Sequence, residues 1–148
     1  PILILSGDKD YIQLHKYANV KQYDPVRKRW ISNANPEKYL AEHILKGDSG
    51  DGIPNVLSAD NCFVMGIRQR PVTQKRIAEW ADINNMHDEV KRNYMRNKAM
   101  IDLSEVPQGM KDEILKAWHE DNGKDRSQLL NYFIKNKLRN LMECITEF

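Results

Sequence analysis

The sequence has 148 residues, of which 41% are hydrophobic and 30% charged, with a formal net charge of +2. This composition fits a globular chain with its own core, and no apolar run approaches the roughly 20 residues that cross a bilayer, so no membrane partner is expected. The two cysteines, Cys62 and Cys144, lack metal-ligand spacing and favour a reducing, cytoplasmic setting over a disulfide framework.

Charge is distributed unevenly along the chain. Basic groups exceed acidic groups by three in residues 1–32 and by four in residues 67–98, whereas acidic groups are in excess by three in residues 33–66. An acidic segment between two basic segments suits a metal-dependent enzyme that acts on a polyanion, although ordinary surface variation produces the same pattern.

The chain opens on an apolar run, Pro1-Ile2-Leu3-Ile4-Leu5, which predicts a parallel strand buried on both faces. Such a strand needs neighbours on each side, and few other strands are predicted. There is also no initiator methionine. We therefore expect this sequence to be a fragment of a larger α/β protein.

Short elements follow. Residues 10–13 resemble a capping box with Asp10 as the N-cap, which predicts a short helix to about residue 16. Residues 20–23 and 29–31 predict a β-hairpin around Asp24-Pro25. Asn35-Pro36 predicts the start of a longer helix, and Gly47 its end.

Beyond a glycine-rich loop at 47–55, helical patterns predominate. They cover about residues 55–65, 73–83, 86–100, 107–121 and 127–146, and the last is broken near Asn136. The predicted fold class is an α/β fragment that is mainly helical, with one buried parallel strand and a β-hairpin followed by a helical domain. Residues 1–35 would belong to the α/β core and residues 36–148 to the helical domain.

Two acidic pairs are the candidates for catalysis. Asp8 and Asp10 follow the first strand, and Asp48 and Asp51 lie in the glycine-rich loop. Carboxylate oxygens are the ligands that Mg²⁺ and Mn²⁺ prefer, and four of them could hold two ions about 3.5–4 Å apart for phosphodiester hydrolysis. The alternative is that these residues are helix caps and turn formers.

The same loop is a candidate phosphate site. Gly47-Asp48-Ser49-Gly50-Asp51-Gly52 places backbone N–H groups in a tight curve before the next predicted helix. It also resembles the nucleophile segment of trypsin-like serine proteases, but that family is all-β and Asp51 replaces an expected glycine. His15 and His43 are therefore predicted to be surface residues, not a catalytic base.

Two segments together carry a family resemblance. Ser6-Gly7-Asp8-Lys9-Asp10-Tyr11-Ile12-Gln13-Leu14 resembles the SxDxDxxQL segment of the flap endonuclease and 5′–3′ exonuclease superfamily. Gly47-Asp48-Ser49-Gly50-Asp51-Gly52-Ile53-Pro54-Asn55-Val56 resembles its GDxxDxIPGV segment. The order and spacing also match. Asn19-Val20-Lys21-Gln22-Tyr23 and the closing Glu147-Phe148 look most like the 5′-nucleases of T-even bacteriophages within this superfamily.

The resemblance implies an enzyme that cuts RNA or DNA from 5′ ends and at flaps in a phage or bacterial host cytoplasm. Its substrate would be a DNA or RNA–DNA duplex with a 5′ flap or fork, and replication proteins such as a single-strand-binding protein or sliding clamp would be further partners. It implies two Mg²⁺ or Mn²⁺ ions. Asp8 would bind the first, Asp10 and Asp51 would lie near the second, and Asp48 would act directly or through water.

The resemblance also implies a helix–three-turn–helix that binds DNA, over about residues 36–82. The nucleic-acid contacts would come from Lys46, Gly47, Ser49, Gly50, Gly52, Asn55, Arg68, Arg70, Lys75 and Arg76. Many members have a second glycine-rich hairpin, but residues 65–76 keep one glycine and carry four basic residues instead. This departure argues against the monovalent cation that relatives bind there.

The family's N-terminal half, which supplies further acidic ligands, has no counterpart in this sequence. We therefore expect the chain alone to bind nucleic acid and to cleave it poorly. Two alternatives remain: a non-catalytic, structure-specific DNA-binding module, and a protein-interaction domain that uses the amphipathic helices beyond residue 107.

Overall fold

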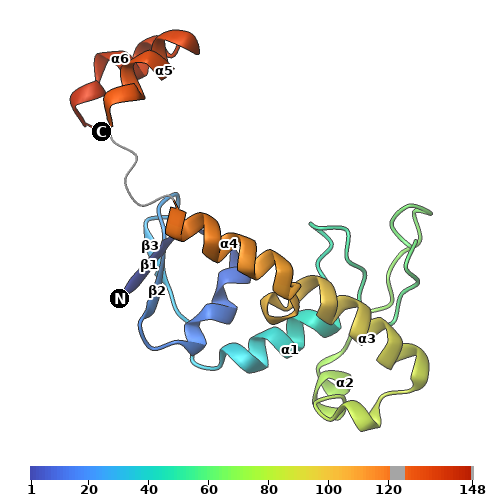
Figure 1. Ribbon diagram of the computed structural model, residues 1–148. Helices are drawn as coiled ribbons and strands as arrows, with labels where there is room; N and C mark the ends of the chain where they lie inside the picture. The colour runs from blue at the N-terminus through green and yellow to red at the C-terminus, as the bar shows by residue number, and fades with distance from the viewer. Residues whose placement is uncertain (121–125, 148) are drawn as a thin grey trace. The chain divides into compact units, whose positions relative to one another are not determined.

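The computed structural model describes residues 1–120 and 126–147 (Figure 1). The chain divides into two compact units, Pro1–Val106 and Pro107–Phe148, and each is described by itself. Both are mainly helical apart from one small sheet in the first unit. The boundary expected between residues 35 and 36 stays a prediction.

The sheet has three strands in the order β1-β2-β3. β1 (Ile2–Leu5) runs parallel to β2 (Val20–Asp24), and β3 (Arg29–Ile31) pairs antiparallel with β2. The parallel pairing and the hairpin are as predicted. Burial of the first strand on both faces is wrong, because β1 lies at the edge of this sheet and Ile2, Leu3 and Leu5 are more than half exposed.

The short helix after β1 is a 3-10 helix, η1 (Lys9–Lys16). Its N-cap is Asp8, whose carboxylate accepts a hydrogen bond from the Asp10 amide at 3.0 Å, so the predicted cap at Asp10 is wrong. Gln13 has no capping role either. Its buried side chain donates to the Ile101 carbonyl at 2.8 Å and accepts from the Leu103 amide at 3.0 Å. These bonds span 88 and 90 residues, so local patterns cannot predict them.

The next helix, α1 (Pro36–Lys46), follows its predicted signals. Asn35 caps it by accepting from the Lys38 amide at 2.9 Å, and Gly47 ends it with a φ of 67°. Its C-terminal turn buries Ile44 and Leu45, which pack into two different apolar clusters of the first unit. α1 is therefore the central support of the loop that follows it.

No α-helix occupies residues 55–65, where one is predicted; the segment consists of turns. The reason is Asn55, whose side-chain oxygen accepts from the Leu57 amide and the Ser58 hydroxyl, each at 3.0 Å. Local side-chain bonds of this kind compete with helix formation. The helix–three-turn–helix expected over about 36–82 is accordingly not confirmed.

The remaining helices of the first unit are α2 (Gln74–Glu79), η2 (Ile83–Asn85), α3 (Asp88–Ile101) and η3 (Leu103–Glu105). α3 confirms the helix predicted at 86–100. The helix predicted at 73–83 begins as expected, with Thr73 as its N-cap, but α2 ends at Glu79 and a turn leads to η2.

α3 presents buried amide side chains to the loop after α1. Asn97, fully buried, donates to the Ile44 carbonyl at 2.8 Å and to the Pro54 carbonyl at 2.9 Å. Asn93 donates to the Val56 carbonyl at 3.0 Å. These bonds satisfy buried carbonyls of α1 and of the loop, so α3 fixes the path of the loop.

Replacing Asn97 with alanine is expected to lower the free energy of unfolding by about 1–3 kcal/mol, because the Ile44 carbonyl loses this donor and the Pro54 carbonyl keeps only the bond from Arg96. Urea denaturation followed by circular dichroism measures the loss. Asn19→Ala, at an exposed position, is the control and should be nearly neutral. Equal losses in both variants would show that these bonds do not stabilise the loop.

The second unit contains α4 (Gln108–Glu120), η4 (Arg126–Gln128), α5 (Leu129–Lys135), α6 (Arg139–Glu143) and η5 (Ile145–Glu147). These confirm the helices predicted at 107–121 and 127–146, except that residue 121 lies outside the described residues. The break predicted near Asn136 is present, and Lys137 there has a φ of 54°. Among described residues, no helix combines the length and hydropathy needed to span a membrane.

Candidate metal and nucleic-acid site

The other three predicted acids all act electrostatically on Asp10. The pKa of Asp10 is raised first by burial and then by the negative charge of Asp8, and the charges of Asp48 and Asp51 raise it further. The nearby His43 opposes them and lowers it. The start of η1 and the loop after α1, far apart in sequence, therefore form one acidic site.

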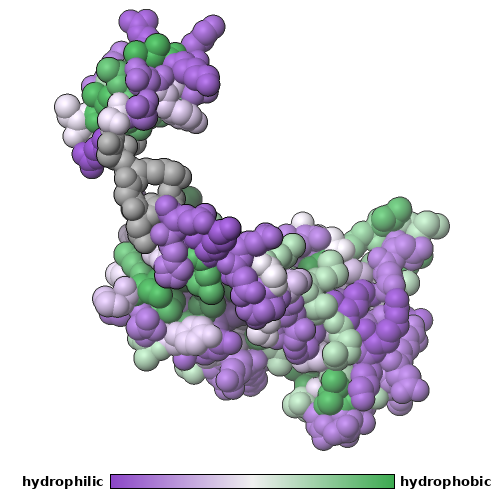
Figure 2. Space-filling view, in the orientation of Figure 1, coloured by the Kyte–Doolittle hydropathy of each residue, from purple (hydrophilic) through white to green (hydrophobic). Residues whose placement is uncertain are grey.

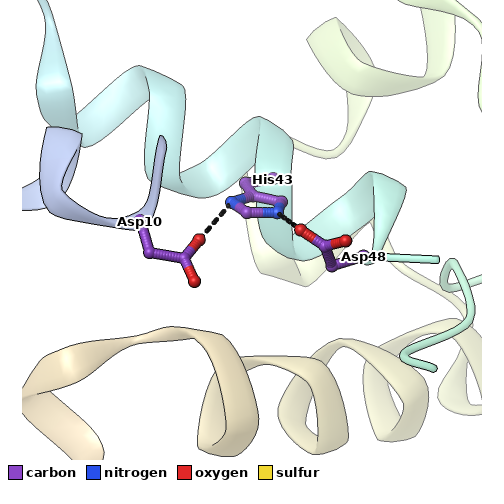
Figure 3. Close-up of side chains that lie close together, drawn as sticks. All are labelled: Asp10, His43 and Asp48. Carbon is purple, nitrogen blue, oxygen red and sulfur yellow. Dashed lines mark hydrogen bonds and ion pairs between the residues drawn. The ribbon is translucent and has the colours of Figure 1, made fainter. Parts of the chain in front are cut away.

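His43 lies between two of these acids (Figure 3). Its Nε2 is 3.0 Å from Oδ2 of Asp48, and its Nδ1 is 3.7 Å from Oδ1 of Asp10. The side chain is buried, so the prediction of a surface histidine is wrong: His43 lies on the face of α1 that packs against η1. A helical spacing of four from Tyr39, whose ring contacts His43, was the available signal.

Two atoms of this cluster are buried without a hydrogen-bond partner. They are Oδ1 of Asp10 and Nδ1 of His43, the pair that face each other at 3.7 Å. Asp10, His43 and Asp48 each offer one ligand atom, and these atoms lie within 4.8 Å of one another. Two carboxylates and an imidazole are suitable donors for a divalent cation, and the partnerless atoms fit a bound ion.

Asp48 is held on several sides. Oδ2 contacts Nζ of Lys9 at 3.0 Å as well as His43, and Oδ1 accepts from the Gly50 amide at 2.9 Å. Burial alone would raise the pKa of Asp48, but the hydrogen bonds from Lys9, His43 and Gly50 lower it from 3.8 to about 2. Asp48 is thus an ionised, oriented carboxylate at neutral pH.

The lowered pKa of Asp48 predicts a pH-dependent contribution to stability. Because the pKa of Asp48 is lower in the folded chain than the unfolded value of 3.8, its ionised carboxylate stabilises the fold at pH values above 3.8. This stabilisation is lost as the pH falls from 3.8 through the folded pKa of about 2. The contribution is about 2 kcal/mol at neutral pH. The unfolding free energies of the unsubstituted chain and Asp48→Asn should therefore converge between about pH 4 and 2 in urea titrations. A difference that is constant over this range would contradict the assignment.

Asp8 and Asp51 differ from the other two acids. Both are exposed; Asp8 uses its carboxylate as the cap of η1, and the Asp51 amide donates to the Asp48 carbonyl at 3.2 Å. They contribute charge to the site without belonging to the group of three ligand atoms. Their roles as metal ligands stay predictions.

The glycine-rich loop is closed by its own amides. Gly50 donates to the Asp48 carboxylate, Asp51 and Ile53 to the Asp48 carbonyl, and Gly52 to the Ser49 carbonyl. A phosphate bound by these amides would have to displace internal bonds. Gly47 is held against the Ile53 and Pro54 backbone, whereas Ser49, Gly50 and Gly52 are exposed.

The other predicted nucleic-acid contacts have varied surroundings. Asn55 is buried, and its side-chain Nδ2 donates to the Arg70 carbonyl at 2.7 Å. This internal bond occupies the side-chain amide that was predicted to contact nucleic acid. Lys46 pairs with Glu42 at 2.8 Å. The remaining basic side chains are exposed, and they are Arg68, Arg70, Lys75 and Arg76.

Sequence reasoning missed an ion cluster that attaches the loop to α3. Asp60 pairs with both Arg92 and Arg96, whose hydrogen bonds lower its pKa to about 2. Arg96 also donates to the Pro54 carbonyl at 2.9 Å. The partners are more than 30 residues apart in sequence, so no local pattern indicates them.

Comparison with known proteins assigns relatives to the chain. The family described as "T4 RNase H, C terminal" matches residues 34–148. The chain is also 29% identical, over 157 residues, to the protein named "Ribonuclease H" of Enterobacteria phage T4. That alignment covers 99% of this chain and 52% of the relative, so the chain spans about half the length of the curated relative it matches.

Proposed function

The chain belongs to the T4 RNase H C-terminal family, and on this premise we propose that it is the C-terminal half of a divalent-metal-dependent 5′-nuclease. The complete enzyme would hydrolyse RNA or DNA from 5′ ends and flaps. The observation that carries the proposal is the acidic cluster of Asp10, His43 and Asp48 beside the glycine-rich loop.

One tautomer of His43 supports a cation at this cluster. When Nε2 carries the proton that bonds Asp48, Nδ1 has a lone pair directed at another acceptor, Oδ1 of Asp10. Two buried acceptors at 3.7 Å repel unless a proton or a metal ion lies between them. Carboxylates favour Mg²⁺ and Mn²⁺, and the imidazole favours Mn²⁺ of these two.

The residues of this chain would have distinct roles in the reaction. Asp10 and Asp48 would hold a divalent ion, with Asp8 and Asp51 adding negative charge or a second binding position. Lys9 would balance the charge of Asp48, and His43 would orient it. A bound divalent ion would supply a hydroxide nucleophile and stabilise the leaving oxygen.

Nucleic-acid binding is the second part of the proposal. Arg68, Arg70, Lys75 and Arg76 are exposed on one segment that contains no acidic residue. Phosphate contacts of this kind are independent of base sequence, and they weaken steeply as salt is raised. We propose a DNA or RNA–DNA duplex with a flap or fork as the ligand.

Mn²⁺ binding to the purified chain tests the metal site. Calorimetry or electron paramagnetic resonance should detect Mn²⁺ binding, and Asp48→Asn should weaken it about 10-fold or more. Asp88→Asn, an exposed acid at the start of α3, is the matched control and should bind like the unsubstituted chain. No Mn²⁺ binding would mean that a proton bridges Asp10 and His43, and would remove the metal assignment.

The same measurements separate the nuclease from a non-catalytic DNA-binding module. The module would bind forked DNA without binding metal, whereas the nuclease half binds both. Because about half of the relative's length lies outside this chain, cleavage by the chain alone should be poor. Efficient Mg²⁺-dependent cleavage by the chain would contradict the need for a second half.

A further inference from the structure

The loop between α1 and α2 ends in an exposed apolar tip, formed by residues 63–67. Val64 is 89% exposed, Met65 63%, Ile67 56% and Phe63 39%. Figure 2 shows apolar side chains at the end of the loop that Figure 1 colours green. Single exposed apolar residues are ordinary, but four within five residues indicate a contact surface.

The apolar tip is held in shape by its backbone. The Met65 amide donates to the carbonyl of Asn61, and the Ile67 amide donates to the carbonyl of Cys62, at 3.0 and 2.8 Å. Both acceptors lie just before the tip. Cys62, 1% exposed, anchors the near end. At the far end, the backbone N–H of Asn55 donates to Oε1 of Gln69, and its side-chain Nδ2 donates to the Arg70 carbonyl, both at 2.7 Å.

Charge around the apolar tip is of one sign. Residues 61–78 contain four basic side chains and no acidic one. Arg68 and Arg70 follow the tip directly, and both are exposed. Asp60, the acid immediately before this segment, is already paired with Arg92 and Arg96 on α3. The partner must therefore offer apolar faces next to negative charge.

We propose that the apolar tip packs against bases exposed at the end or branch point of a nucleic-acid duplex, while Arg68 and Arg70 bind the adjacent phosphates. This proposal rests on the proposed nucleic-acid function and adds a role for residues 63–67. Bases at a duplex end present flat apolar faces beside a polyanionic backbone, and apolar side chains insert at such steps in other proteins. A rigid tip suits this contact because little conformational entropy is lost on binding.

The test uses the 148-residue chain and a forked DNA duplex with 2-aminopurine at the last base pair. The double variant Val64→Ser/Met65→Ser should bind the fork about 10-fold more weakly, as expected when base contacts are lost. Its salt dependence should be unchanged. The unsubstituted chain should raise 2-aminopurine fluorescence by unstacking the base, and the double variant should not.

Two further variants separate the contributions. Val26→Ser, at a position 88% exposed in the β2–β3 turn, is the matched control and should behave like the unsubstituted chain. Arg68→Ala/Arg70→Ala should instead reduce the slope of log affinity against log salt by about two. This variant should lose affinity for blunt and forked duplexes alike.

Other results would overturn the proposal. Unchanged fork affinity and fluorescence in Val64→Ser/Met65→Ser would exclude base contacts while leaving nucleic-acid binding intact. If the unsubstituted chain binds phosphatidylserine vesicles and Val64→Ser/Met65→Ser does not, while fork affinity is unchanged, the tip is a membrane contact instead. Failure of the unsubstituted chain to bind any duplex would reject both this inference and the nucleic-acid part of the proposed function.

Discussion

Replacing Gly47 with alanine is expected to lower the free energy of unfolding by about 3–5 kcal/mol, because strain and steric overlap act together. Gly47 has a φ of 67°, a conformation that disfavours a side chain. A Cβ would lie 2.4 Å from the Ile53 carbonyl oxygen and 2.6 Å from the Pro54 carbonyl carbon. These are backbone atoms, so neither can move away without displacing the loop. Urea denaturation of the two proteins measures the loss.

Gly52→Ala is the matched control for this substitution. Gly52 has a similar φ of 75°, but a Cβ there would meet no atom within 4 Å. Its replacement should therefore cost only the strain of the left-handed backbone, about 1–2 kcal/mol. Equal losses at the two positions would show that close packing of α1 against residues 53 and 54 is unimportant.

In the complete 5′-nuclease that we propose, Asp10→Asn is expected to lower turnover about 100-fold or more. The substitution keeps the size of the side chain and removes the charge that faces His43. Affinity for forked DNA should change little, because an acidic residue does not attract phosphate. Single-turnover cleavage and fluorescence anisotropy, measured on the same substrate, separate the two effects.

The control for Asp10→Asn is Asp112→Asn, on an exposed face of α4, which should leave both quantities unchanged. An Asp10→Asn enzyme with normal turnover would remove Asp10 from the catalytic machinery. A parallel loss of turnover and DNA affinity would instead indicate that the substitution disturbs the fold around η1.

Elements with strong local signals were predictable from the sequence. Asn35, Pro36 and Gly47 define both ends of α1, because a cap, a fixed φ and a left-handed glycine act within one or two turns. The β2–β3 hairpin and α3 were predicted for similar reasons. The helix expected at 55–65 failed because Asn55 bonds to its own neighbours and to Arg70, a contact that periodicity does not reveal.

The site was only partly accessible from the sequence. Family motifs indicated that Asp8 and Asp10 would act with Asp48 and Asp51, and the charges of the other three acids do raise the pKa of Asp10. His43 was missed because its role depends on the packing of α1 against η1, which no motif records. The N-cap of η1 was predicted at Asp10 although it is Asp8, because either aspartate can cap a helix and the sequence does not distinguish them.

The edge strand β1 has a practical consequence for experiments on this chain. Its side chains Ile2, Leu3 and Leu5 are more than half exposed, and among described residues no strand pairs with the edge opposite β2. Open apolar edges are templates for pairing with another molecule. We expect concentration-dependent self-association, visible as a rising sedimentation coefficient. Affinities for metal and DNA should therefore be determined in dilute protein, below the concentration at which such association begins.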